Sequence, residues 1–400
     1  MTAGYAPRVP TLWHGRGAAR QVTGRLTAGR ETLVVADAAL MHLAPTEATW
    51  TRVEVDARAV GVAAVTAIAK DIRRHRPDVI VAVGGGSVLD ATKIAALALS
   101  HGRVFDFVVE RASRSALTFL PDAPPPVDVV AIPTTLGTSS ETNSVGILTA
   151  DAGHRLIVGR SLTPRHAVID PDNLKTLTPG AIREGALEAF LRLAGASTSP
   201  RRSARGKGDA VALARALLYT VGRGDASDVA SDGTRLRLAR LSAATQRSAA
   251  LRGDDPYSAR HWYLANEVSF ALGVRKMAAT AAVIAAVWRR ICSGDRRWGD
   301  RHSLEEFWRR VAERAELPLD PPSGITTLVD RWGPVLPPRP SVSAVHRIAV
   351  AVEQCWGHRY PMLPGLRAED FVDVLRDSRW SSQPGRPHVP TFDDRGKGGE

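Results

Sequence analysis

A short run of strand-forming residues that leads directly into three glycines constrains the fold of this chain more than any other feature. Five β-branched or small apolar residues (79–83) precede the glycines (84–86), and an Ala- and Leu-rich helical pattern starts at once. The pattern places Ser87 to cap the first helical turn. Glycines let backbone N–H groups approach an anion at the positive N-terminus of a helix. The unit predicts a phosphate cradle, or else a tight turn without a ligand.

The length and the changing pattern of the chain predict two domains. A chain of 400 residues is too long for one ordinary hydrophobic core. Strand and helix patterns alternate over residues 1–178, which is typical of a parallel sheet covered by helices, whereas 3.6-residue periodicity dominates residues 179–380. We therefore expect an α/β domain followed by an all-α domain. The polar, Gly- and Pro-rich residues 381–400 predict a disordered tail.

Individual elements follow from local patterns. Residues 12–18 predict an edge strand, a turn and a short helix, and Pro-rich breaks stand near 317–322 and 334–340. The compact basic segment 201–208 reads as a flexible loop, and no convincing strand is found after residue 178. Buried strands are expected at 32–37, 79–83 and 127–133, and helices at 59–75, 180–196, 209–221, 234–252, 257–291, 304–315, 341–356 and 367–379.

Composition narrows the class of protein. Hydrophobic residues make up 44% of the chain and charged residues 24%, which is typical of a soluble globular protein. We expect a cytoplasmic protein without a membrane partner, because no apolar run reaches the roughly 18 residues of a membrane span and the N-terminus lacks a signal core. Only two cysteines, Cys292 and Cys355, are present, which fits a reducing compartment.

The net charge of +12 comes largely from arginine. Such a charge can indicate a nucleic-acid surface or an acidic partner. The arginines, however, are scattered along the chain, and their few clusters lack interleaved aromatic residues. A general bias of the proteome towards Arg and Ala explains this pattern better, so we expect no nucleic-acid partner.

Three motifs in chain order carry a resemblance to a known family. They are Asp37 at the end of a strand, the Gly-Gly-Gly-Ser-x-x-Asp-x-x-Lys unit at 84–93, and Pro-Thr-Thr-x-Gly-Thr-x-Ser-Glu at 133–141. The two longer motifs are specific as a pair. From about residue 12 to 376 the chain resembles the iron-containing alcohol dehydrogenase family, within the dehydroquinate synthase-like superfamily. The resemblance implies a Rossmann-like nucleotide-binding domain, an all-α domain, and a homodimer.

The resemblance also implies a site for a nicotinamide nucleotide. Asp37 corresponds to the acid that approaches the adenosine ribose, which favours NAD over NADP because a carboxylate repels a 2′-phosphate. Alternatively, Asp37 is only a solvated acid at a strand end, and Asp90 and Lys93 only flank the turn. The expected cofactor-binding residues are Asp37, Gly84, Gly85, Gly86, Ser87, Asp90, Thr134, Thr135 and Thr138. The segment around Arg155 can also carry a cation that meets the cofactor.

The second half departs from the family's metal site. The family binds its metal through an Asp and a His four residues apart on the first helix, and through two later His residues. Aligned without gaps, these four positions hold Glu188, Arg192, Trp262 and Lys276. A one-residue shift would bring His261 to the third position. Asn266 replaces a further His that the family places near the nicotinamide.

These replacements leave at most Glu188 and His261 as metal ligands, fewer than the three that a catalytic divalent site normally uses. Bound iron or zinc is therefore not expected. The candidate catalytic residues are Lys276, Arg192 and Asn266. Lys276 and Arg192 could replace the metal electrostatically, and a buried Lys276 could act as a base. Alternatively, the site has decayed to a salt bridge between Glu188 and Arg192.

The leading hypothesis for function is an NAD-dependent dehydrogenase that acts on an alcohol, with both reactants in the cleft between the domains. An arginine-lined pocket favours an anionic substrate, such as a carboxylate or phosphate ester. Family and composition together also suggest the dehydrogenases of daptide-type peptide biosynthesis, which act on a peptide C-terminal Thr. One alternative is a catalytically silent NAD-binding scaffold in a biosynthetic complex. Another is a dehydroquinate synthase-like lyase, against which the missing metal histidines argue.

Overall fold

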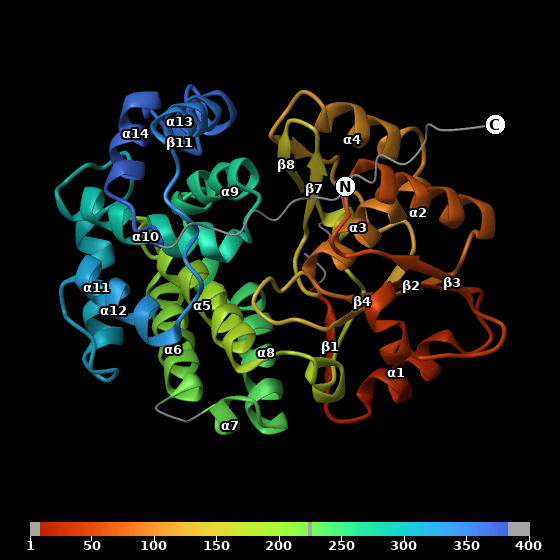
Figure 1. Cartoon of the computed structure of the whole chain (residues 1–400). Coiled ribbons are helices and arrows are strands. Elements are labelled where there is room, and N and C mark those ends of the chain that lie inside the picture. The colour runs from red at the N-terminus through yellow and green to blue at the C-terminus, as the bar shows by residue number, and fades with distance from the viewer. Residues whose placement is uncertain (1–8, 223–225, 383–400) are drawn as a thin grey trace, which may run out of the picture.

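A computed structural model describes residues 9–222 and 226–382 of the chain. The molecule has two halves that lie side by side, a sheet covered by helices and a bundle of helices (Figure 1). The main sheet has six parallel strands in the order β1-β9-β6-β4-β2-β3. Its strands are β1 (Thr11–His14), β2 (Thr32–Asp37), β3 (Thr51–Val55), β4 (Val79–Gly84), β6 (Asp128–Pro133) and β9 (His166–Ile169).

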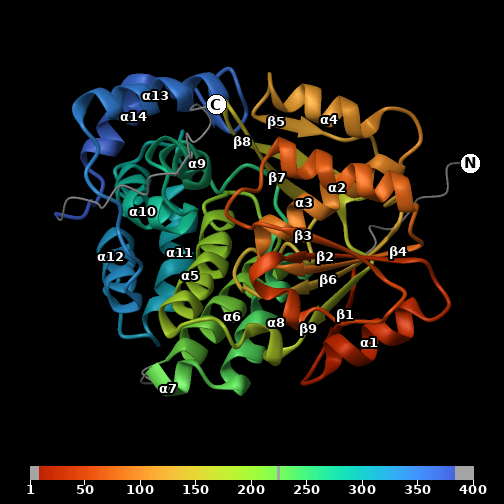
Figure 2. The same ribbon diagram turned by 45° about the vertical axis from the view of Figure 1, so that its right-hand side comes forward.

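Helices cover both faces of this sheet (Figure 2). On β4, Ile80 and Ala82 belong to the core beneath α2 (Val62–His75) and α3 (Gly86–Ala96). The alternate residues of β4 belong to the core beneath α1 (Ala18–Thr27). Both faces of the strand are thus buried, which explains why its sequence is a continuous apolar run rather than an alternating one.

A smaller sheet stands beside the main one, where the sequence patterns gave no prediction. It consists of β7 (Val145–Ala150) antiparallel to β8 (Gly153–Val158), with β5 (Leu117–Phe119) on the other side of β8. Alternate residues of β7 and β8 are only partly buried, so these strands lack the continuous apolar run of β4. Helix α4 (Val104–Ala112) precedes the first of them.

The other half is a helical bundle around one large apolar core. Two two-residue strands, β10 (Gly357–His358) and β11 (Leu363–Pro364), also lie there, so the expectation of no strand after residue 178 is wrong. The helices are α5 (Pro179–Ala196), α6 (Ala204–Val221), α7 (Ala226–Val229), α8 (Asp232–Arg247), α9 (His261–Leu272), α10 (Lys276–Cys292), α11 (Arg301–Ala312), α12 (Pro321–Trp332), α13 (Val342–Trp356) and α14 (Ala368–Arg376).

Three predictions about the helical half differ from the structure: one of a helix, one of a break and one of a loop. The single helix expected over 257–291 is interrupted at Gly273, whose φ of +60° ends α9. The Pro-rich break near 317–322 contains the start of α12, because proline is compatible with the first turn of a helix. Most of the segment 201–208 belongs to α6 rather than to a loop, since Ser203 caps that helix by accepting from the Gly206 N–H at 3.0 Å.

The domain boundaries at 178 and 380 stay a prediction. The expected disordered tail falls outside the described residues from 383 onwards. Among the helices of the described chain, none is both long and apolar enough to cross a membrane.

Candidate functional site

The main sheet has one point where its connections change direction, between β2 and β4. The chain runs from β2 outward to β3 and then returns to the opposite side of β2 to form β4. In open α/β sheets, ligands bind in the crevice at the carboxyl ends of the strands beside such a point. Ala36 pairs with Val83, so Asp37 and Gly84 end their strands at the same level. The crevice therefore has Asp37 on one side and the three glycines on the other.

The N-terminus of helix α3 lies at this crevice and is uncapped. Its N-cap residue is Gly85, and no side chain of the described residues accepts a hydrogen bond from the first turn. The prediction that Ser87 caps the helix is wrong, because the helix already begins at Gly86 and Ser87 lies inside its first turn, exposed to solvent. The free N–H groups and the helix dipole provide an anion-binding end.

The glycines are required because threonines of the next loop pack against them. A Cβ on Gly86 would lie 2.8 Å from Thr138 Cγ2, and a Cβ on Gly85 would lie 3.2 Å from Thr135 Cγ2. The Thr134 N–H donates to the Gly84 carbonyl at 3.0 Å. Thr134 Oγ1 is buried and has no hydrogen-bond partner among residues 9–222 and 226–382. The two motifs at 84–93 and 133–141 therefore form a single wall of the crevice.

Asp37 retains an acceptor for a ligand. Its Oδ1 accepts from the Ala39 N–H at 3.1 Å and so caps the short 3₁₀ helix Ala38–Leu43. Its Oδ2 has no hydrogen-bond partner within the described part of the chain, and the side chain is half-buried at the strand end. A carboxylate oxygen in this place can accept a hydrogen bond from a ribose 2′-hydroxyl.

Asp90 and Lys93 form a buried brace rather than a ligand surface. Asp90 is 8% exposed; its Oδ2 accepts from the Ile147 N–H at 3.0 Å and its Oδ1 from the Ser140 hydroxyl. Burial lowers the pKa of Lys93, and the neighbouring Asp90 carboxylate opposes that change. This geometry favours the structural interpretation of both residues. The Lys93 ammonium contacts Asp90 Oδ1 at 3.0 Å, Ser140 O at 3.0 Å, Asn143 Oδ1 at 2.9 Å and Val145 O at 2.5 Å.

The four positions that correspond to the family's metal site converge in space. Glu188 Oε1 lies 3.8 Å from Arg192 Nη2 on α5. The Lys276 ammonium at the start of α10 lies 5.4 Å from the ring centroid of Trp262 on α9, a cation–π contact. Burial lowers the pKa of Lys276, while the charge of Glu188 acts in the opposite direction. Burial also raises the pKa of Glu188, opposed by Arg192 and Lys276.

This set of side chains does not fit a divalent metal. Glu188 is the single oxygen donor among the four positions, and the cationic Arg192 and Lys276 would repel a metal ion. Nowhere in residues 9–222 and 226–382 do three or more His, Cys, Asp or Glu side chains gather closely enough to hold one. His261 packs against Gly195, whose Cβ would lie 2.8 Å from His261 Cε1. Gly195 is seven residues along α5 from Glu188, roughly 10 Å, so His261 does not complete a site there.

Asn266 and His154 form a second polar group beside Lys276. The Asn266 amide donates to the His154 carbonyl at 3.3 Å and to Glu267 Oε1 at 3.0 Å. Burial, and then the charge of Lys276, lowers the pKa of His154 to about 4. Its Nδ1 lies 3.1 Å from Thr149 Oγ1. Asn266 therefore orients its own neighbours, and its predicted catalytic role stays a prediction.

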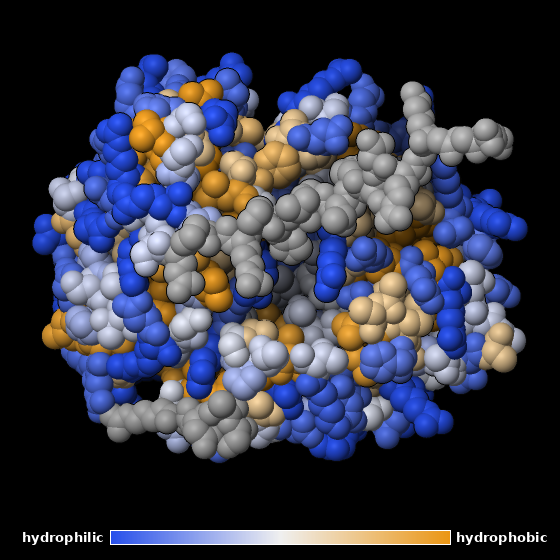
Figure 3. Space-filling view, in the orientation of Figure 1, coloured by the Kyte–Doolittle hydropathy of each residue, from blue (hydrophilic) through white to orange (hydrophobic). Residues whose placement is uncertain are grey.

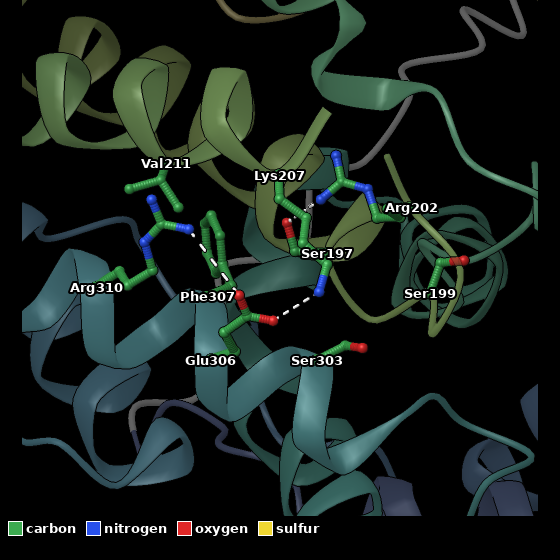
Figure 4. A pocket seen from close by; sticks show the side chains of 9 residues that line it. All are labelled: Ser197, Ser199, Arg202, Lys207, Val211, Ser303, Glu306, Phe307 and Arg310. Atoms are coloured by element: carbon green, nitrogen blue, oxygen red, sulfur yellow. Dashed lines mark hydrogen bonds and ion pairs between the residues drawn. The ribbon is translucent and has the colours of Figure 1, made fainter. Parts of the chain in front are cut away.

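A small pocket between α6 and α11 lies apart from this crevice (Figure 4). Glu306 points between two cations there, 2.7 Å from Lys207 Nζ and 4.0 Å from Arg310 Nη1. One carboxylate offsets only one of these two positive charges, and Arg202 also lines the pocket, which holds none of the predicted site residues. The surface is recessed instead between the two halves (Figure 3).

Two residues that hold the threonine loop or its partner Arg192 were not identified from the sequence. Ser242 and Thr245 of α8 hydrogen-bond to the loop or to Arg192; the Ser242 hydroxyl lies 2.8 Å from Ser139 Oγ. Their only sequence signal is a pair of small hydroxyl residues one helical turn apart. Such a pair is common on helices. Its role becomes visible only in the structure, where it lies next to a loop about a hundred residues earlier in the chain.

Comparison with known proteins agrees with these observations. The model of the family described as "Iron-containing alcohol dehydrogenase" matches residues 10–171. A phosphonoacetaldehyde reductase from Streptomyces viridochromogenes is 39% identical over 193 residues, which are 47% of this chain and 47% of that protein. The match thus spans about half the length of this curated relative.

Solved structures match over nearly the whole chain. The NADH-dependent butanol dehydrogenase A of Thermotoga maritima gives a TM-score of 0.73 at 15% identity, covering 94% of this chain and 98% of that one. The sulfoacetaldehyde reductase of Bifidobacterium kashiwanohense, solved in complex with NAD+, gives 0.70 at 17% identity, covering 94% and 98%. At these identities the likeness concerns the fold, and it confirms the predicted fold class. The family match thus covers residues 10–171, and the likeness of fold extends over nearly the whole chain.

Proposed function

We propose that this protein is an NAD-dependent oxidoreductase that interconverts a small anionic alcohol and its carbonyl compound without a divalent metal. The observation that carries the proposal is the open N-terminus of α3 in the crevice beside Asp37. The pyrophosphate would lie against the N–H groups of Gly86 and Ser87, and the ribose would approach Asp37 Oδ2. Thr134, Thr135 and Thr138 would line the same crevice. When bound, NAD accepts or donates the hydride at its nicotinamide ring.

Lys276 is the group that supports proton transfer. In the reducing direction its ammonium gives a proton to the carbonyl oxygen while carbon receives the hydride, which leaves a neutral amine. In the oxidising direction the neutral amine takes the hydroxyl proton. Burial lowers the pKa of Lys276, which brings the amine closer to the range in which a general acid–base group works well. In its charged form it also stabilises a developing alkoxide.

The anionic substrate is inferred from charge and from the relatives. Lys276 and Arg155 both lower the pKa of His154, so two cations lie near this histidine. The names of the two reductases in the comparison describe aldehydes that carry a phosphonate or a sulfonate group. A peptide C-terminal Thr stays a prediction, as do the homodimer and the cytoplasmic location. Both alternatives, the silent scaffold and the lyase, also use the nucleotide site.

A binding and turnover experiment separates these functions. NADH and NADPH are titrated against the protein by following tryptophan fluorescence, and NADH consumption is then measured with phosphonoacetaldehyde, sulfoacetaldehyde and an uncharged aldehyde of similar size. We expect NADH to bind more tightly than NADPH and to be consumed faster with the charged aldehydes. Binding without turnover of any aldehyde would favour the scaffold. Absence of binding to either nucleotide would contradict every nucleotide-based proposal.

A further inference from the structure

We propose that Arg192 is a positioning residue, which fixes the threonine loop 134–139 in the shape that the nucleotide crevice requires. This inference rests on the proposed nucleotide site. It assigns Arg192 a different role from the electrostatic replacement of a metal that the sequence suggested.

The four terminal hydrogens of the Arg192 guanidinium group are all used by protein acceptors. One terminal nitrogen, Nη1, donates to Ser139 Oγ at 3.1 Å and to Thr245 Oγ1 at 2.9 Å. The other, Nη2, donates to the Thr138 carbonyl at 3.1 Å and to the Gly137 carbonyl. Each terminal nitrogen of a guanidinium carries two hydrogens, so all four are engaged. None of them is left to face a substrate.

The backbone of the loop needs such support. Ser139 has a φ of +54° and Gly137 a φ of +111°. A serine in the left-handed region is strained, and it persists only where its surroundings hold it. Arg192 binds two successive carbonyls just before Ser139 and also the Ser139 hydroxyl, so it supports the strained turn directly.

Close packing fixes the same loop at a second point on α5. A Cβ on Gly137 would lie 2.8 Å from Gly185 Cα and 2.9 Å from Glu188 Oε2. The loop backbone therefore lies directly against the helix that carries Arg192. With two attachments on one rigid helix, the loop cannot rotate away from α5 unless the Arg192 hydrogen bonds break.

Thr138 transmits this restraint to the crevice. Its carbonyl accepts from Arg192, while its side chain is the one that packs against Gly86 at the start of α3. Displacement of the loop would thus move the wall beside the N–H groups that face the phosphate. Arg192 joins the helical half to the nucleotide-binding half at this point.

Lysine cannot replace arginine in this role. An ammonium has three donors at one atom, whereas the planar guanidinium presents paired donors that reach acceptors on the loop and on α8 at once. Arg192→Lys keeps the charge but loses the geometry, so it separates positioning from electrostatics. Arg192→Ala removes both, and it leaves space that a free guanidinium ion can fill. Arg183→Met on the same helix is the matched control, since Arg183 has no hydrogen bond to the loop among the described residues.

The test measures the Kd of NADH and the kcat at saturating NADH for each variant. We expect Arg192→Lys and Arg192→Ala each to raise the Kd at least about tenfold, since a single charge-assisted hydrogen bond is worth about that much. Added guanidinium should restore affinity in Arg192→Ala, and Arg183→Met should match the unmodified protein. The pH profile of kcat should keep its shape in Arg192→Lys.

Two results would overturn the positioning role. One is an unchanged Kd in both Arg192 variants, and the other is a loss of kcat at saturating NADH with the Kd unchanged. If the Arg192 variants do not fold, the double variant Ser139→Ala/Thr245→Val tests the proposal instead, because it removes both acceptors of Arg192 Nη1. Unchanged affinity for NADH in this double variant would contradict the positioning role. An unmodified protein that fails to bind NADH would instead contradict the proposed function itself.

Discussion

Gly86 and Thr138 pack so closely that position 86 has no room for a methyl group. A Cβ there would lie 2.8 Å from Thr138 Cγ2 and 3.0 Å from Thr138 Oγ1. Real Cβ atoms do not approach other atoms so closely, so any side chain at position 86 must displace the loop or the helix. The contact joins the two sequence motifs, and in the proposed nucleotide site it would make affinity for the nucleotide depend on a glycine.

We predict that Gly86→Ala weakens NADH binding by about tenfold or more, because the shift of α3 or Thr138 costs hydrogen bonds to the phosphate. Fluorescence titration of NADH measures the Kd. The control is Gly208→Ala on α6, where an added Cβ meets no atom within 4 Å. Equal affinity in Gly86→Ala and the control would place the nucleotide elsewhere.

Lys93→Met should destabilise the fold rather than alter catalysis alone. The substitution leaves the Asp90 carboxylate buried without its cation, which costs about 3–5 kcal/mol. Urea unfolding should show a lower midpoint with an unchanged slope. The double variant Asp90→Asn/Lys93→Met should recover part of the loss, since no charge is then buried unpaired. A single variant as stable as the unmodified protein would show that the brace is unimportant.

Lys276→Met should lower the kcat of carbonyl reduction by roughly 100-fold or more, the usual contribution of a general acid, with little change in the Kd of NADH. Reduction uses the ammonium form, so its rate should fall as pH rises through the lowered pKa of Lys276; oxidation should show the reverse. Rate profiles against pH in both directions measure this. Lys70→Met, at an exposed position, serves as control. A pH dependence that survives in Lys276→Met would assign it to another group.

His261 should make the fold sensitive to acid. Burial, together with Lys276, lowers its pKa from 6.5 to about 3, so between these values the unfolded chain binds a proton that the folded chain does not. Its contribution to stability is therefore complete above pH 6.5 and is lost as pH falls. The stability difference between the unmodified protein and His261→Gln should shrink by about 1.4 kcal/mol per pH unit in this range.

Glu141 has the opposite effect on the pH dependence of stability. Burial raises its pKa to about 7, so its contribution favours the folded state at low pH and is lost as pH rises. Since it is the same in both proteins, it cancels in the difference. Urea unfolding at a series of pH values gives the free energy of unfolding of each protein, and hence its slope against pH. Parallel slopes for the two proteins would mean that His261 is protonated in the folded state.

The nucleotide-binding half was largely predictable because its signals are local. The strand at 79–84 with its glycines is one contiguous stretch of sequence, and the threonine motif at 133–141 is another. Each stretch forms its structure with residues that are near it in the chain. The small sheet of β5, β7 and β8 was not predicted, since its half-buried strands lack a continuous apolar run. Helix α12 was not predicted because its two prolines, at the first turn, resemble a break.

The roles of residues at the site depend on distant partners and could not be predicted. Arg192 was aligned with a metal position of the family, yet its partners lie more than fifty residues away on the threonine loop and α8. Asp90 lies within a cofactor motif, but its carboxylate oxygens accept from Ser140 and Ile147. The alignment identifies which positions meet. Only the three-dimensional contacts show which donors remain for a ligand.

The most direct test of the account is the rate of NADH consumption with phosphonoacetaldehyde after the protein is purified and assayed in chelator. The same assay is repeated with added Fe2+ or Zn2+. We predict equal turnover in all three conditions, with turnover lowered by roughly 100-fold or more in Lys276→Met. Turnover that appears only with added metal, together with a metal ion bound in stoichiometric amount, would contradict the account.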